Sequence, residues 1–255
     1  MASPVTRHGG YWTIGVTGAT GLFGRMILQQ LLDHFHWPPA QLVAICRDCS
    51  KNEANEWRAR GLQVREADFG DDKSPAVMAA HPKRVSLVEA YRGIDRLIIV
   101  SVDTLANWYQ LHANAINAAV AAGVKHIVYT SSPTLPVQTP PLTPLPAEDP
   151  LVENLLHGCG RGYTILGNNI WYDDLVDKVY KQMIAGGTIY TLDANGRAAH
   201  VSKLNCALAA ATVLTQPNAP SRKIEISGPQ VLTRQQVSRI SLFNLTTYVL
   251  IRYGK

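Results

Sequence analysis

Several features are absent from this 255-residue sequence, and each absence excludes a class of protein. No apolar run reaches the roughly 20 residues that a helix needs to span a bilayer. Residues 1–10 contain no apolar core of a signal peptide, which favours a cytoplasmic location. The net charge is +5, but Lys and Arg are scattered, whereas a nucleic-acid surface needs a concentrated basic face. We therefore expect neither a membrane nor a nucleic acid as a partner.

Cysteine is also scarce, with only four residues, at positions 46, 49, 159 and 206. In the cytoplasm these cysteines are expected to stay reduced. Cys46 and Cys49 form a C-x-x-C pair, but a redox pair of this kind stands at a helix start in a thioredoxin-like context. This pair follows a predicted strand of a different fold. We therefore expect neither a redox nor a metal role for it, and no metal site elsewhere.

What the sequence does contain is an alternation of short apolar runs and amphipathic segments. Strands are predicted over residues 11–17, 42–45, 63–67, 96–101, 126–131, 163–166 and 223–226. Helices are predicted over residues 25–35, 53–60, 86–91, 107–122, 150–157, 173–185 and 205–215, and another follows a capping box of Thr233 and Gln236. This alternation predicts an α/β fold with a doubly wound parallel sheet of the Rossmann type.

A proline-rich segment, residues 132–146, interrupts this pattern with six prolines. It follows the carboxyl end of a predicted strand, which is where such sheets bind their ligands. Two interpretations stay open for it, a plain surface loop and the edge of a lid.

A glycine-rich turn lies between the first predicted strand and the first predicted helix. Gly18, Gly21 and Gly24 form the pattern G-x-x-G-x-x-G, in the strand and helix context that a dinucleotide site requires. Gly18 allows a tight turn, Gly21 lets the backbone approach a pyrophosphate, and Gly24 lets the helix pack closely on the sheet. The N–H groups at the helix start then hold the phosphates. The candidate contacts in this turn are Gly18, Thr20, Gly21, Leu22, Phe23 and Gly24.

The residue after the second predicted strand indicates which dinucleotide is bound. NAD sites place an acidic residue there for the ribose hydroxyls, but this chain has Arg47, whose guanidinium can pair with a 2′-phosphate. Asp48 opposes this charge, yet the pattern favours NADP(H). Asp68 and Phe69 follow the third strand, where a side chain can reach the adenine, although Asp68 is equally suited to cap a helix. The candidate cofactor contacts also include Ser101, Val102 and Thr130.

Segments along most of the chain carry a family resemblance. They are residues 16–21, Arg47, and residues 67–69, 86–90, 93–97, 123–132, 163–166, 168–169 and 171–172. In order and spacing they resemble the NmrA-like branch of the atypical short-chain dehydrogenases, most of all its NADPH-binding, quinone-oxidoreductase-like members. The resemblance implies an NAD(P)-binding Rossmann domain over residues 1–150 and a substrate cleft formed by residues 151–255. It implies reduction of a quinone or small carbonyl compound, or nucleotide sensing without turnover.

The chain departs from the family pattern at three places. The family often has Arg where this chain has Gly167, and Asp where it has Asn205. Residues 242–255 do not resemble the family's C-terminal part. We therefore expect a small substrate-binding part that is either truncated or rebuilt, with a more open cleft.

The usual catalytic pair of short-chain dehydrogenases is missing. None of the ten tyrosines is followed by Lys four residues later, and no lysine lies between Lys125 and Lys178. The candidate catalytic residues are Ser131, as a hydrogen-bond donor or a strand cap, and Tyr172, as part of the cleft or of the core. Three functions stay open: an NADP(H)-dependent oxidoreductase, a non-catalytic NADP(H) sensor, and a non-redox isomerase or dehydratase. The sequence does not indicate the oligomeric state.

Overall fold

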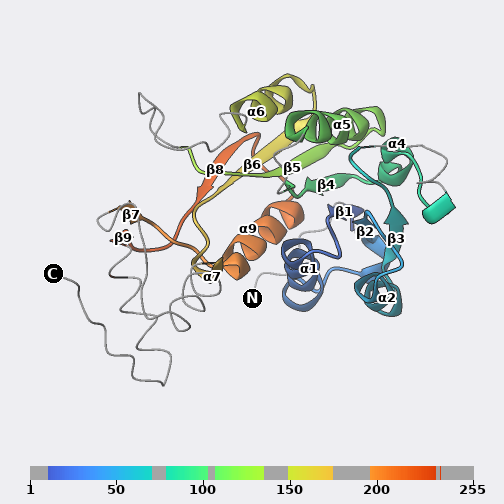
Figure 1. The fold of residues 1–255 in the computed structure, drawn as a ribbon, viewed down its shortest axis with the longest axis horizontal. Coiled ribbons are helices and arrows are strands. Elements are labelled where there is room, and N and C mark those ends of the chain that lie inside the picture. The colour runs from blue at the N-terminus through green and yellow to red at the C-terminus, as the bar shows by residue number, and fades with distance from the viewer. Residues whose placement is uncertain are drawn as a thin grey trace.

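A parallel sheet forms the centre of the computed structural model, which describes residues 11–70, 79–102, 107–134, 149–174, 196–233 and 236 (Figure 1). The strand order is β3-β2-β1-β4-β5-β6-β8, and every neighbouring pair is parallel. The strands are β1 (Ile14–Thr17), β2 (Leu42–Cys46), β3 (Gln63–Glu66), β4 (Arg96–Ile99), β5 (His126–Ser131), β6 (Gly162–Asn168) and β8 (Arg222–Ile226). The order reverses direction between β1 and β4, which confirms the predicted doubly wound sheet and creates a ligand-binding crevice there.

Helices cover both faces of this sheet (Figure 1). One face carries α1 (Leu22–Gln29), α2 (Asn52–Ala59) and α9 (Lys203–Thr215). The other carries α4 (Leu87–Tyr91), α5 (Trp108–Ala121) and α6 (Asp149–Gly158). The central strands β1, β2, β4 and β5 are buried along their whole length because both faces are covered, which explains their nearly continuous apolar sequences. None of the helices in the described ranges is long and apolar enough to cross a membrane.

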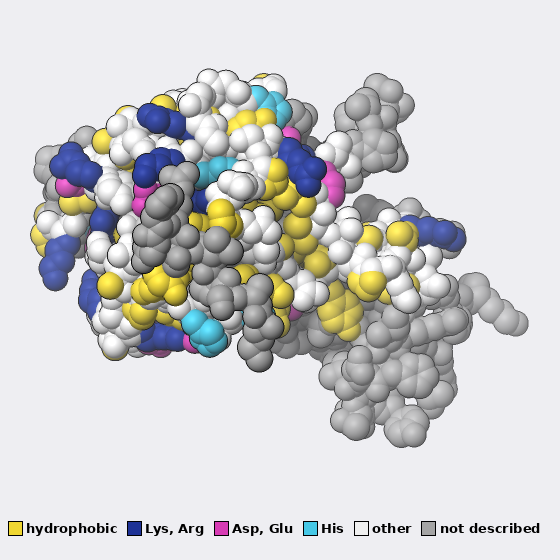
Figure 2. Space-filling model, turned by 180° about the vertical axis from the view of Figure 1, so that it is seen from behind, with side chains coloured by type: hydrophobic (Ala, Val, Ile, Leu, Met, Phe, Trp, Pro, Cys, Tyr) yellow, Lys and Arg dark blue, Asp and Glu magenta, His cyan; other side chains and the backbone are white. Residues whose placement is uncertain are grey.

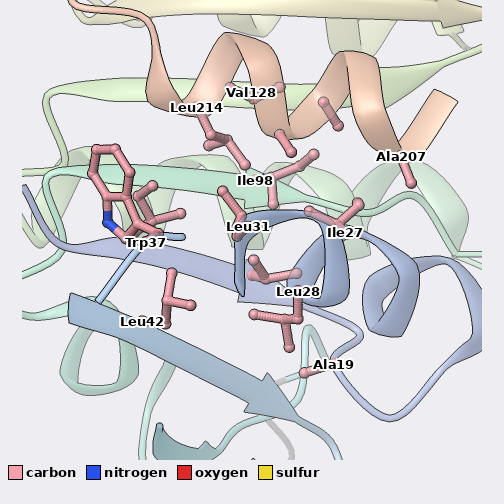
Figure 3. Packing of buried hydrophobic residues seen from close by; sticks show 14 of the residues in the cluster. Ala19, Ile27, Leu28, Leu31, Trp37, Leu42, Ile98, Val128, Ala207 and Leu214 are labelled. Atoms are coloured by element: carbon pink, nitrogen blue, oxygen red, sulfur yellow. The ribbon is translucent and has the colours of Figure 1, made fainter. Parts of the chain in front are cut away.

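The larger core cluster joins segments that are far apart in the sequence, from Trp12 to Leu214. Ile27 of α1 and Leu31, which follows that helix, belong to one cluster with the sheet residue Ile98 and with Leu214 of α9 (Figure 3). Because α9, β6 and β8 follow residue 150 and yet complete this sheet and core, both parts of the chain share one hydrophobic interior. The domain division at residue 150 stays a prediction.

Several predicted boundaries are wrong by a few residues. α1 begins at Leu22 inside the glycine-rich turn, and it passes at Gln30 into a π-helical turn, η1 (Gln30–His34). α9 begins two residues before Asn205, because the Ser202 hydroxyl accepts a hydrogen bond from the Asn205 N–H at 3.1 Å and caps the helix. A short antiparallel pair, β7 (Arg197–Ala198) with β9 (Leu232–Thr233), was not predicted. It carries no alternating apolar pattern that would reveal it.

The C-terminal capping box forms as predicted. The Thr233 N–H donates to Gln236 Oε1 at 2.8 Å, and the Gln236 N–H donates to Thr233 Oγ1 at 3.2 Å. The helix predicted to follow, the tail from residue 242, most of the proline-rich segment and most of the predicted helix 173–185 lie outside the described residues. Within that last range the structure gives α7 (Tyr172–Asp174).

Basic side chains form no continuous patch on the face shown in Figure 2. The Lys and Arg side chains lie there in separate groups, with apolar and uncharged surface between them. This distribution agrees with the scatter of the same residues along the sequence.

Candidate functional site

A cavity of about 840 Å³ opens at the carboxyl ends of β1 to β4, on the side of the sheet's reversal point. Seven predicted cofactor residues line it: Gly18, Thr20, Gly21, Arg47, Asp68, Phe69 and Val102. The other described residues of its wall are Thr17, Ile45, Asp48, Lys51, Ala67, His81, Arg84, Val100 and Leu111. Residues singled out in four separate segments of the sequence therefore meet at one place, whereas Leu22, Phe23 and Gly24 are not in this wall in the described structure.

The backbone of the glycine-rich turn requires glycine at two of its three positions, Gly18 and Gly24. Gly18 has a φ of +64°, in the left-handed region, and its carbonyl accepts the Gly21 N–H at 2.9 Å. A Cβ on Gly24 would stand 2.7 Å from the Gly18 carbonyl carbon. Gly21 is the N-cap of α1, and no side chain caps this helix. The first N–H groups of α1 therefore have no side-chain acceptor in the described structure, as an anion site at a helix start requires.

Two cationic side chains flank the cavity after β2. Arg47 is exposed, and Lys51, which sequence reasoning missed, lines the same wall. Asp48 is bound locally, because its Oδ1 accepts the Ser50 hydroxyl at 2.6 Å and the Ser50 N–H at 2.9 Å. These hydrogen bonds hold the pKa of Asp48 below its usual value. The charge that seemed to oppose Arg47 is thus committed to a local turn.

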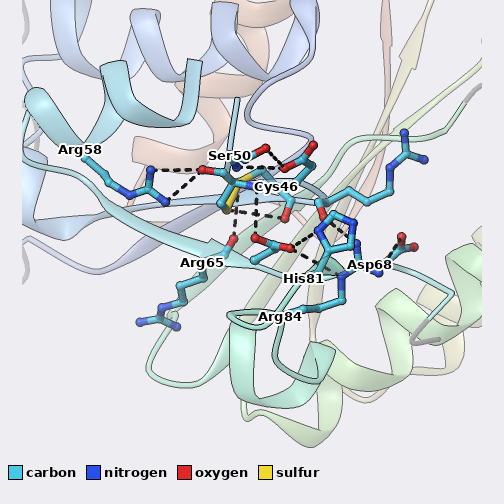
Figure 4. A network of polar contacts seen from close by, with 11 residues as sticks. Cys46, Ser50, Arg58, Arg65, Asp68, His81 and Arg84 are labelled. Atoms are coloured by element: carbon cyan, nitrogen blue, oxygen red, sulfur yellow. Dashed lines mark hydrogen bonds and ion pairs between the residues drawn. A yellow bond between two sulfur atoms is a disulfide. The ribbon is translucent and has the colours of Figure 1, made fainter. Parts of the chain in front are cut away.

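A buried polar network supports this wall from behind. Arg84, whose side chain is 8% exposed, donates to the Arg47 carbonyl at 2.8 Å and lies 3.7 Å from an Asp68 carboxylate oxygen. Glu66 Oε1 lies 2.7 Å from Nδ1 of His81 and 3.8 Å from Nε of Arg84, two residues labelled in Figure 4. Sequence reasoning missed Glu66, His81 and Arg84, since nothing in their local patterns relates them to Arg47.

Three side chains position the segment that follows β4. The Val100 N–H donates to Thr17 Oγ1 at 2.9 Å, and the Ser101 N–H donates to Thr130 Oγ1 at 2.8 Å. The Val102 N–H donates to His112 Nε2 at 3.1 Å. In the described structure Ser101 and Thr130 therefore bind each other. Of the three predicted cofactor residues Ser101, Val102 and Thr130, Val102 lines the cavity.

Leu22 and Phe23 differ from the glycines beside them. Leu22 is 59% exposed, whereas Phe23 is 8% exposed and lies against Trp171, with ring centroids 5.3 Å apart. Neither side chain lines the cavity in the described structure.

Asp68 Oδ1 accepts the Gly70 N–H at 2.9 Å, so it closes a local turn. The alternative of a helix cap depends on residues 71–78, which lie outside the described ranges.

Ser131 belongs to a different polar cluster, between the end of β5 and α6. Its hydroxyl donates to Glu153 Oε1 at 2.7 Å, and Lys223 Nζ donates to the same oxygen at 2.8 Å. Glu153 and Lys223 have side-chain exposures of 13% and 21%, so the pair is largely shielded from water. Ser131 does not line the 840 Å³ cavity in the described structure.

The same cluster explains why this chain has glycine at position 167. Gly167 pairs with Ser131 in the sheet. A Cβ there would stand 2.6 Å from Glu225 Oε2 and 2.9 Å from Lys223 Cε. A larger residue here would therefore displace the ends of two β8 side chains, Glu225 and the Lys223 that reaches Glu153.

Tyr172 lies on the other side of the sheet, beside the start of α9 (Figure 1). Its N–H donates to the Val201 carbonyl at 2.9 Å. The neighbouring Trp171 packs against the core with Lys203 Nζ 4.9 Å from its ring centroid, and Lys203 also binds Asp174. No described contact brings Tyr172 to Ser131. A lysine from α9 does reach this segment, although the sequence spacing had excluded one.

The expectation that all cysteines stay reduced is wrong for Cys46 and Cys49. The structure joins them in a disulfide with a Cα separation of 5.9 Å. The turn closed by Asp48 and Ser50 brings Cys49 back to the end of β2, a geometry that the compartment argument ignored. Cys159 and Cys206 are free, and burial raises the pKa of the Cys206 thiol to about 11. Among the described residues, no group of three or more His, Cys, Asp or Glu side chains could hold a metal ion.

Comparisons with known proteins agree with this geometry. Residues 12–160 match the model of the NmrA-like family. Quinone oxidoreductase 2 of Escherichia coli is 32% identical over 225 residues, which cover 88% of this chain and 72% of that protein. A solved Citrobacter sp. triphenylmethane reductase complexed with NADP(H) superposes with a TM-score of 0.77 and 28% identity, over 94% of this chain and 78% of that one. The NADPH-dependent quinone oxidoreductase of Escherichia coli complexed with NADPH gives 0.76 and 28%, over 91% and 75%.

Proposed function

The chain belongs to the NmrA-like family, and on this premise we propose that it is an NADP(H)-dependent oxidoreductase acting on a quinone or a small carbonyl compound. The predicted resemblance to quinone-oxidoreductase-like members is confirmed by the matches above. The solved triphenylmethane reductase is complexed with NADP(H) and the solved quinone oxidoreductase with NADPH, which supports the same cofactor in this chain.

The observation that carries the proposal is the cavity wall that links the glycine-rich turn to Arg47 and Lys51. The residues fit the cofactor, because Gly18 and Gly24 keep the turn free of side chains there and Arg47 with Lys51 add two cations to the wall. The N-terminus of α1 would hold the pyrophosphate, and Arg47 with Lys51 would hold the 2′-phosphate. Asp68 and Phe69 would lie at the adenosine end.

Hydride transfer to a quinone requires little of the protein beyond positioning the cofactor and the acceptor. NADP(H) supplies a hydride when it is bound. A quinone needs little help from an enzyme acid, since its reduced form is stabilised by conjugation. The protein therefore acts mainly by positioning, with Thr17, Thr130 and His112 fixing the segment after β4 beside the cavity.

Ser131 and Tyr172 stay candidates with different roles. The Ser131 hydroxyl donates a hydrogen bond to Glu153. Ser131 can therefore deliver a proton only if this hydrogen bond is replaced by one to the substrate. Tyr172 is half-buried, and we assign it a positioning role against the acceptor.

Turnover tests the proposal. Purified protein is mixed with NADPH and a panel of quinones and aldehydes, and cofactor oxidation is followed against a protein-free control. We expect oxidation with at least one quinone. Tight NADPH binding without turnover on any acceptor would contradict the enzyme proposal and favour the nucleotide sensor. Conversion of a substrate without cofactor consumption would favour the isomerase. The cytoplasmic location stays a prediction, to be checked by cell fractionation.

A further inference from the structure

The Cys46–Cys49 disulfide lies between two cavities of the protein. One is the 840 Å³ cavity lined by Arg47 and Asp48, the two residues that the disulfide encloses. The other, of about 420 Å³, is lined by Cys49. Its remaining described wall consists of Arg58, Val64, Arg65, Glu66, Lys83, Val85, Glu89 and Arg92. The function proposed above makes no use of this second cavity.

The two sulfur atoms differ in their access to the second cavity. Cys49 is 7% exposed and lines the cavity, whereas Cys46 is 1% exposed at the end of β2 and does not. A reagent in the cavity therefore meets Cys49 first. The rate of thiol–disulfide exchange depends on which sulfur is attacked and on access to it, so this difference directs attack to Cys49 and makes Cys46 the leaving group.

The wall of the second cavity favours an anion. It carries four cationic side chains against the two carboxylates Glu66 and Glu89. Arg58 uses its guanidinium hydrogen bonds on neutral oxygens, donating to the Cys49 carbonyl at 3.2 and 3.3 Å. Arg65 likewise donates to the backbone carbonyls of Ala90 and Arg92, both at 2.8 Å. Glu89 pairs with Arg92 at 2.9 Å and also acts on Arg65, so the wall keeps an excess of positive charge beside Cys49 rather than four free cations.

We propose that Cys49 is the attack site of a thiol–disulfide exchange centre for a low-molecular-weight thiol that carries carboxylates. The thiolate attacks Cys49 Sγ, the Cys46–Cys49 bond breaks, and a mixed disulfide forms on Cys49. Cys46 leaves as a thiolate and takes a proton. A second thiol then displaces Cys49 and yields the small-molecule disulfide and the reduced protein; the reverse steps restore the native bond.

The exchange also has a path to the cofactor wall. The Cys49 N–H donates to Glu66 Oε2 at 3.2 Å, and the other oxygen of Glu66 binds His81 and lies near Arg84. Arg84 donates to the Arg47 carbonyl. Figure 4 shows Arg58 on one side of the disulfide and His81 and Arg84 on the other. Opening the bond removes one of the constraints on the turn that holds Arg47, beside the Asp48–Ser50 and Arg84–Arg47 hydrogen bonds, so reduction is expected to weaken NADPH binding. This consequence, unlike the exchange itself, rests on the proposed function.

The test uses wild-type protein purified without reductant and three probes: glutathione, 2-mercaptoethanol and cysteamine, which are anionic, neutral and cationic. Each rate of reduction is divided by the rate of the same thiol with 2-hydroxyethyl disulfide. Mass spectrometry after acid quenching locates the adduct. We expect adducts on Cys49 and a normalised rate several-fold higher for glutathione than for cysteamine. Lys83→Gln should reduce this preference, whereas Arg222→Gln, at the far edge of the sheet, should not.

The proposal is overturned if Cys46 and Cys49 are isolated as thiols, if the adduct forms on Cys46, or if the three normalised rates are equal. Calorimetry then compares NADPH binding by the oxidised and reduced protein, with a several-fold weaker affinity expected after reduction. Equal affinities would refute the coupling and leave the proposed function intact. Absence of NADPH binding in both forms would refute the proposed function and leave the exchange centre intact.

Discussion

The carboxyl edge of the sheet has two regions that treat their polar groups in opposite ways. Around β1 to β4, the turn N–H groups, Arg47 and Lys51 border an open cavity. Around β5 and β6, Ser131 is bound to Glu153, which also binds Lys223, and the cluster lies outside that cavity. The first region presents groups that suit an anionic ligand, whereas the polar side chains of the second region form hydrogen bonds with one another. Polar groups in the first region are therefore available to a bound nucleotide, whereas those in the second are paired with one another.

The largest effect is expected from Gly24→Ala in the first region. The new Cβ meets the Gly18 backbone, which cannot move without opening the turn. We expect NADPH affinity to fall by about 100-fold or more, roughly 2.7 kcal/mol, as measured by calorimetry. Gly158→Ala is the matched control, since a Cβ there meets nothing within 4 Å. Equal NADPH affinity in both variants would remove the turn from the binding region.

Arg47→Ala sharpens the comparison by separating the two nucleotides. A lost hydrogen bond between charged groups costs about 1.5–3 kcal/mol. NADPH affinity should therefore fall by roughly 10- to 150-fold, while NADH affinity stays nearly constant. Arg222→Ala serves as the control for loss of one positive charge. Parallel losses for NADPH and NADH would contradict the assignment of Arg47 to the 2′-phosphate.

Substitutions in the second region, around Ser131, Glu153 and Lys223, should change the free energy of unfolding rather than the affinity for NADPH. Lys223→Met leaves the Glu153 carboxylate, 13% exposed, without its ion-pair partner. We expect a loss of about 1–3 kcal/mol in the free energy of unfolding, measured with urea, and unchanged NADPH affinity. Lys125→Met breaks an ion pair in which the lysine is 68% exposed, and should cost less than about 1 kcal/mol. Unchanged stability with weaker NADPH binding in Lys223→Met would contradict the distinction between the two regions.

His126, at the start of β5, gives the same core a pH dependence. Burial lowers its pKa to about 4, and Nε2 bonds with Thr164 Oγ1 at 2.9 Å. The unfolded chain binds a proton near pH 6.5, so the folded state loses stability as the pH falls from about 6.5 to 4. The loss should be of the order of 2 kcal/mol. It should shrink in His126→Gln when unfolding is measured across this range. Equal slopes for both proteins would refute the assignment.

The smallest effect is expected at Tyr172. Tyr172→Phe removes only the hydroxyl, and turnover should change by less than about twofold. Tyr172→Ala removes the ring and should raise the apparent Michaelis constant for the acceptor. A collapse of turnover in Tyr172→Phe with NADPH binding retained would show that the hydroxyl donates a proton.

The sequence predicted what depends on local pattern. The glycine spacing, the residue after each strand and the strand–helix alternation identified the sheet and seven residues of the cavity wall. Lys51 and Arg84 escaped because nothing in their local spacing relates them to Arg47. Ser131, Glu153 and Lys223 meet across 22 and 70 residues, a separation that no local pattern encodes. The disulfide was missed because the compartment argument ignored the turn that closes it.

The central claim is that this chain transfers hydride from NADP(H) and selects it through the wall after β2. The most direct measurement is the ratio of kcat/KM for NADPH to that for NADH, with one reducible quinone and the wild-type protein. The account predicts turnover above the protein-free control and a ratio of at least about 10, the weakest value expected from one charge-assisted phosphate contact. A ratio near one, or no oxidation of either nucleotide, would contradict it.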